Sequence, residues 1–74
     1  MNYRDRLEIN PDIMMGKPVI KGTRITVELL LRKLSEGMTI ENLLEAYPNL
    51  KSEDIYAVLS YSADVIGKEE MIVS

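Results

Sequence analysis

A chain of 74 residues corresponds to one domain near the lower size at which a hydrophobic core alone stabilises a fold. It contains no cysteine and no histidine, which excludes disulfides, thiolate metal sites and histidine-dependent catalytic arrangements. The net charge of −3 at pH 7 argues against a nonspecific nucleic-acid binder, and the composition as a whole predicts a binding protein without a cofactor rather than an enzyme.

The first third of the chain has the composition of short strands joined by turns. Residues 7–9 alternate apolar and charged side chains, and residues 19–20 form a β-branched pair between two turn-forming segments. We therefore predict two short strands that form a β-hairpin. Gly16 and Gly22 are expected to supply the turn conformations at its ends.

From Thr26 onward the apolar residues recur with the period of a helix, and three helices are predicted. Their expected N-caps are Thr26, Thr39 and Ser52, and their expected stops are Gly37, Pro48 and Gly67. The apolar stripes are Val27, Leu30, Leu31 and Leu34 in the first helix, Ile40, Leu43, Leu44 and Tyr47 in the second, and Ile55, Val58, Leu59 and Ile66 in the third. The sequence thus predicts a mainly α fold, a three-helix bundle preceded by the hairpin.

No linker or repeat interrupts the chain, so we expect a single domain over residues 1–74, with a strand and turn region (1–25), helices (26–67) and a tail (68–74). The tail ends in the apolar run Met71-Ile72-Val73, which is costly to leave in water. It is expected to contact a protein partner or a second subunit, for instance as a strand added to the hairpin edge; the alternative is a frayed end.

The basic residues concentrate near the start of the chain. Residues 1–33 carry seven Lys and Arg against four Asp and Glu, a balance of +3, and residues 34–74 carry two against eight, a balance of −6. We predict that Lys17, Lys21 and Arg24 contact nucleic acid or another anion. The alternative is ordinary surface charge, with Arg24 bracing the turn carbonyls.

Residues 39–66 have the pattern of a helix-turn-helix unit, in which the second helix would read DNA. Its outward face would comprise Glu53, Tyr56, Ala57, Ser60 and Asp64. That face is acidic, and the connection of residues 47–51 is longer than usual, so a simple packed helical hairpin is the alternative. The carboxylates of these helices, among them Asp54, are expected mostly on solvent faces and not in a catalytic pair.

Four segments between Ile9 and Tyr61 are distinctive when taken together. They are Gly16-Lys17-Pro18-Val19-Ile20-Lys21-Gly22-Thr23-Arg24-Ile25 with Val27, then Gly37-Met38-Thr39, then Tyr47-Pro48-Asn49-Leu50, and Glu53-Asp54-Ile55 with Ala57, Leu59 and Tyr61. Through these segments the chain resembles the small prokaryotic family catalogued as domain of unknown function 433.

The resemblance implies a homeodomain-like fold, usually dimeric, and a role as the antitoxin of a type II toxin–antitoxin pair. Such an antitoxin binds a PIN-like nuclease toxin to block it and often represses its own operon by binding DNA. We therefore expect a cytoplasmic homodimer with a PIN-like nuclease and operator DNA as partners and no membrane contact, since no apolar run approaches the roughly 20 residues of a membrane span. The alternative is a structural or protein-interaction domain without nucleic-acid contact.

Overall fold

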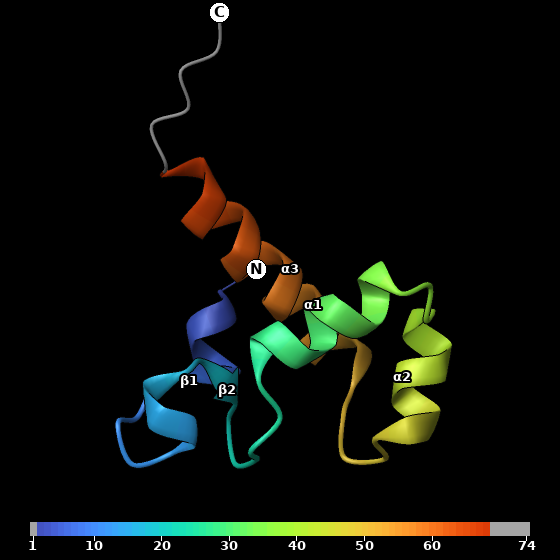
Figure 1. The fold of residues 1–74 in the computed structure, drawn as a ribbon, viewed down its shortest axis with the longest axis horizontal. Coiled ribbons are helices and arrows are strands. Elements are labelled where there is room, and N and C mark those ends of the chain that lie inside the picture. Colours follow the sequence, from blue (N-terminus) through green and yellow to red (C-terminus); the bar gives the residue numbers. More distant parts are fainter. Residues whose placement is uncertain (1, 69–74) are drawn as a thin grey trace, which may run out of the picture.

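Three helices follow a two-stranded hairpin in the computed structural model, which describes residues 2–68 (Figure 1). The elements are, in chain order, the 3-10 helix η1 (Tyr3–Asp5), β1 (Leu7–Glu8), the 3-10 helix η2 (Met14–Gly16), β2 (Val19–Ile20), α1 (Val27–Ser35), α2 (Ile40–Ala46) and α3 (Ser52–Gly67). This mainly helical architecture with an N-terminal hairpin confirms the predicted fold class. The apolar run Met71-Ile72-Val73 lies outside the described residues.

The hairpin strands are antiparallel, with Leu7 opposite Ile20 in β1 and β2. A turn follows β2 and is closed by a hydrogen bond from Ile20 N to the Ile25 carbonyl at 2.9 Å. Gly22 lies in this turn with φ +79°, a conformation that residues with a Cβ rarely adopt. Thr23 Oγ1 closes the turn by donating to the Ile20 carbonyl at 2.8 Å and accepting from Ile25 N at 3.0 Å.

Gly16 has φ +83° at the other end of the β1–β2 connection. The prediction that the two glycines supply turn conformations is therefore confirmed. Much of the distinctive block from Gly16 to Ile25 builds a tight turn into α1, and its two apolar strand residues, Val19 and Ile20, are buried.

The first two helices begin and end as their sequences predict. Thr26 Oγ1 accepts from Leu29 N at 3.0 Å at the start of α1, and Gly37 follows its end with φ +100°. At the start of α2, Thr39 Oγ1 accepts from Asn42 N at 3.0 Å and Asn42 Oδ1 accepts from Thr39 N at 3.1 Å. This reciprocal pair satisfies two backbone donors that the helix itself leaves free.

The start of α3 differs from the prediction, because Lys51 and not Ser52 is its N-cap residue. Asp54 Oδ2 accepts from Lys51 N at 2.9 Å, and Asp54 Oδ1 accepts from Arg6 Nη1 at 2.9 Å. Asp54 is therefore an exception to the expectation that most of the helix carboxylates face solvent, since its side chain is only 8% exposed. A carboxylate is tolerated there because a backbone amide and a guanidinium share its charge.

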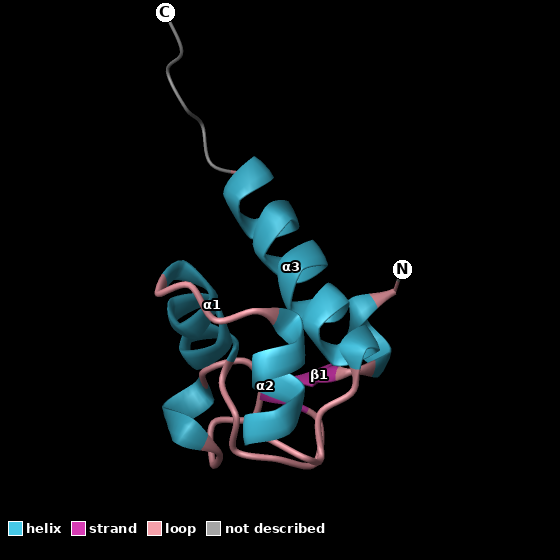
Figure 2. Ribbon diagram, turned by 90° about the vertical axis from the view of Figure 1, so that its right-hand side faces the viewer, coloured by secondary structure: helices cyan, strands magenta, loops and turns pink. Residues whose placement is uncertain are grey.

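The core lies where the hairpin, α1, α2 and the first half of α3 meet. Its buried apolar side chains are Leu7, Val19, Ile20, Val27, Leu30, Leu43, Leu50, Ile55, Ala57 and Val58. Two predictions for α3 are wrong: Leu59 and Ile66 are 41% and 60% exposed, and Ala57 is buried instead of facing outward. Ile66 is exposed because α3 extends past α1 and α2, so its last turns lie beyond the core (Figures 1 and 2).

Candidate functional site

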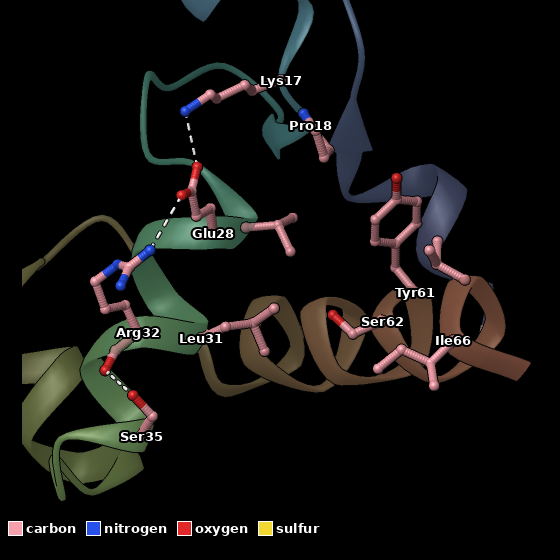
Figure 3. Close-up of a pocket in the computed structure, with 11 residues that line it drawn as sticks. Lys17, Pro18, Glu28, Leu31, Arg32, Ser35, Tyr61, Ser62 and Ile66 are labelled. Carbon is pink, nitrogen blue, oxygen red and sulfur yellow. Dashed lines mark hydrogen bonds and ion pairs between the residues drawn. The ribbon is translucent and has the colours of Figure 1, made fainter. Parts of the chain in front are cut away.

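An open groove of about 500 Å³ runs between α1 and the C-terminal half of α3 (Figure 3). Its floor and walls are mainly apolar, and charged side chains lie on one rim. The lining residues are Lys17, Pro18, Val27, Glu28, Leu31, Arg32, Ser35, Tyr61, Ser62, Val65 and Ile66. Because the groove is open along its length, it suits the side chains of another protein surface better than an enclosed small molecule.

Large apolar side chains remain uncovered on the α3 wall of the groove. Val65 is 44% exposed and Ile66 is 60% exposed, and Leu31 points from α1 toward α3 (Figure 3). Leu59 is exposed two turns before Ile66, on the same side of the helix. An isolated exposed apolar residue is ordinary, but a continuous apolar surface beside a groove is typical of a contact site.

The charged rim of the groove is an ion-pair chain centred on Glu28. Its carboxylate accepts from Lys17 Nζ at 2.8 Å and from Arg32 Nη2 at 3.3 Å (Figure 3). The hydrogen bond from Lys17, followed by that from Arg32, holds the pKa of Glu28 below its ordinary value. The rim therefore carries two cations and one acid, and these three side chains are paired with one another.

A second, smaller hollow adjoins the groove, and Pro18 and Tyr61 line both. Tyr3 packs its ring edge-on against Tyr61, with ring centroids 5.4 Å apart and an interplanar angle of 79°. Hydrogen bonding to the Asp64 carboxylate, together with desolvation, raises the pKa of Tyr3. The pair packs η1 against the middle of α3.

The three predicted anion contacts do not share one hollow. Lys17 lies on the groove rim and is ion-paired with Glu28 at 2.8 Å. Lys21 lines a hollow on another part of the surface, and Arg24 lines a third hollow together with Glu8. Lys17 thus lies apart from the other two, whereas the hollows of Lys21 and Arg24 adjoin at Thr23, which lines both.

The hollow that contains Lys21 also contains Lys51, although 30 positions of sequence separate them. It has a volume of about 360 Å³ and is lined by Asp5, Arg6, Ile20, Lys21, Thr23, Asn49, Lys51 and Asp54. Sequence reasoning assigned Lys51 to the acidic half of the chain and gave it no role. Only the packing of the turn at Gly22 against the start of α3 brings the two lysines together.

Residues 2–68 contain neither a group of metal ligands nor a membrane-spanning helix. Within that range no cluster of three or more potential ligand side chains is arranged to hold a metal ion. Nor is any helix among these residues long and apolar enough to cross a membrane.

These features define a small, mainly helical domain with an N-terminal hairpin and a surface groove, and comparison with known proteins gives its family. The model of the family described as "Protein of unknown function (DUF433)" matches residues 7–62. The chain therefore belongs to the DUF433 family, as its resemblance to that family predicted.

Two relatives illustrate the match. The chain is 36% identical over 59 residues to the uncharacterized protein y4eO of Sinorhizobium fredii, an alignment that covers 80% of this chain and 27% of that protein. It also matches the crystal structure of a DUF433 member from Anabaena variabilis with a TM-score of 0.79 and 31% identity, over 82% of this chain and 60% of that one. The chain thus spans about a quarter of the first relative and less than two thirds of the second.

Proposed function

We propose that this chain is a non-catalytic binding module that acts as a homodimer, in the manner of the antitoxin of a type II toxin–antitoxin pair. The observation that carries the proposal is the open apolar groove between α1 and α3, with Val65 and Ile66 exposed along it. The membership of the DUF433 family supports it through the antitoxin role that the resemblance implies.

The occupant that we assign to the groove is the same face of a second copy. The projecting end of α3 is a ridge and the groove beside it is a depression, so two copies related by a twofold axis can each insert the ridge of one into the groove of the other. A standard interface buries about 800 Å² per partner. That is about one seventh of the 5358 Å² of accessible surface of the chain, an area that two helical faces can provide.

The rim favours such a contact because its charges are already paired. Lys17 and Arg32 both donate to Glu28, so burying the rim does not leave an unpaired acid in the contact.

The partner of the dimer, on this proposal, is a PIN-like nuclease. A structural or protein-interaction domain without nucleic-acid contact is the second candidate, favoured by Glu53 and Asp64 on the exposed side of α3, where they would repel phosphate.

The dimer is tested by light scattering at micromolar concentration, which should give about twice the 8.4 kDa chain mass. Ile66→Asp should return the mass to that of one chain, because it places an unpaired carboxylate in the contact. Met15→Asp is the matched control, since Met15 is 90% exposed and does not line the groove. A monomer for the unaltered chain, or equal effects of the two variants, would contradict the assignment.

The nuclease partner is tested separately by purifying the tagged chain from its native host. Recovery of a PIN-like nuclease, and loss of its RNA cleavage on adding the purified chain, would support the antitoxin role. If a dimer forms but the chain leaves the activity of a PIN-like nuclease encoded beside it unchanged, the antitoxin role fails and the dimer stands.

A further inference from the structure

We infer that the hollow between the Gly22 turn and the start of α3, which contains Lys21 and Lys51, is a phosphate-binding site. The two lysines are its cationic ligands and the Asn49 amide is a neutral donor. The assignment of nucleic acid as the source of the phosphate goes beyond the proposed function, and the site itself does not depend on the dimer or on the nuclease.

The charges around the hollow leave the two lysines available. Arg6 is bonded to Asp54 at 2.9 Å and lies 3.9 Å from Glu53, so it offsets one of the two acids at the start of α3. Within residues 2–68 the structure gives neither Lys21 nor Lys51 an ion-pair partner, and both are exposed. Asp5 is the remaining acid that lines the hollow. The side chains that line the hollow therefore include three cations, Arg6, Lys21 and Lys51, and two acids, Asp5 and Asp54, in a chain whose net charge is −3.

Both lysines stand on backbone that hydrogen bonds hold in place. Lys21 N donates to the Arg6 carbonyl at 2.8 Å, and Lys51 N donates to Asp54 Oδ2 at 2.9 Å. Ile20 and Leu50, the residues before each lysine, are buried in the core. Little backbone entropy remains to be lost on binding, although the lysine side chains themselves must still be ordered.

The donor set suits a phosphate group exposed on a polymer better than an enclosed nucleotide. Lysine ammonium groups bind phosphate as point charges, and asparagine adds a directional hydrogen bond. Thr23 contributes no further donor, because its hydroxyl already donates to the Ile20 carbonyl at 2.8 Å. Among the residues that the structure describes, no aromatic side chain lines the hollow to stack on a base. We therefore assign the phosphodiester backbone of DNA as the ligand.

The inference is tested with two probes, inorganic phosphate and a short mixed-sequence DNA duplex at low salt. Phosphate, compared with chloride at equal ionic strength, should shift the amide NMR signals of residues 21–24 and 49–52 selectively. Lys21→Gln and Lys51→Gln should each weaken duplex binding and lower the slope of log affinity against log salt by about 0.9. Asp5→Asn should strengthen binding, because it removes the opposing acid.

Lys68→Gln is the matched control, because it removes the same charge about 25 Å along α3 from Lys51. Circular dichroism verifies that each variant is folded. We expect folded variants, because the substituted side chains are exposed. Equal weakening by Lys68→Gln and Lys51→Gln, or absence of any selective NMR shift, overturns the site. Selective shifts with phosphate but none with the duplex overturn DNA as the ligand and leave a site for free phosphate. The mass of the particle, measured on the same variants, reports the dimer independently.

Discussion

The two halves of α3 have similar apolar content but different surroundings. In the first half Ile55, Ala57 and Val58 are fully buried, whereas in the second half Val65 and Ile66 are about half exposed. The first half is buried by the hairpin, α1 and α2, and the second projects beyond them (Figure 2). The comparison teaches that apolar residues on one helix can differ in role: those of the first half form the core, and those of the second half leave an apolar surface that the proposed dimer would cover.

Replacing a buried residue of the first half should give the largest loss of stability. Ile55→Ala should lower the free energy of unfolding by about 2–5 kcal/mol, because the cavity that it leaves has no room to collapse. The free energy is measured by urea denaturation. Ile66→Ala should lower it by under about 0.5 kcal/mol at dilution, and should abolish any rise of stability with protein concentration. Equal losses for the two variants would show that the halves do not differ.

The Arg6–Asp54 pair joins the N-terminal segment to the first half of α3, and its loss should have the next largest effect. Asp54→Ala removes both the acceptor for Lys51 N and the partner of Arg6, and should cost about 2–3 kcal/mol. Glu53→Ala is the neighbouring control: it loses two exposed contacts, one with Arg6 at 3.9 Å and one with Ser52 Oγ at 3.0 Å, and should change stability by under about 0.5 kcal/mol. Thermal unfolding followed by circular dichroism distinguishes the two variants.

The turn into α1 should respond to a substitution through its backbone alone. At both Gly22 and Gly67 an added Cβ meets no heavy atom within 4 Å, but Gly22 has φ +79° and Gly67 lies in a helix. Gly22→Ala should therefore destabilise the fold by about 1–2 kcal/mol. Gly67→Ala should be neutral or stabilise by up to about 1 kcal/mol. The urea midpoint should fall for Gly22→Ala, and it should rise or stay unchanged for Gly67→Ala.

Much of the fold follows from local sequence signals. Thr26, Gly37 and Thr39 were predicted in their roles because a cap or a left-handed stop depends on neighbours within a few residues. The site depended on packing and was largely missed. Helical period placed Leu59 and Ile66 with Ile55 but carries no information about where the other helices end, and no local pattern pairs Arg6 with Asp54 or brings Lys21 to Lys51.

The smallest expected effect is the pH dependence of stability that arises from the ion pairs on the groove rim. The pKa of Glu28 lies below its ordinary value of 4.5, so its ion pairs favour the folded state above that value. This contribution should be lost as the pH falls through the depressed pKa, below 4.5, and only weakly, because the rim is exposed and screened by salt.

NMR titration of the Glu28 carboxyl carbon measures this shift directly. Lys17→Gln should move the pKa up toward 4.5 by more than Arg32→Gln does, since the Lys17 hydrogen bond at 2.8 Å is the larger cause. If the groove closes against a second copy, the rim also loses solvent, which strengthens the ion pairs but also disfavours the charged carboxylate, so the Glu28 pKa should change between dilution and concentrations where the dimer forms. A Glu28 pKa that is the same at both concentrations, in a sample whose mass does change, would place the dimer contact elsewhere than the groove.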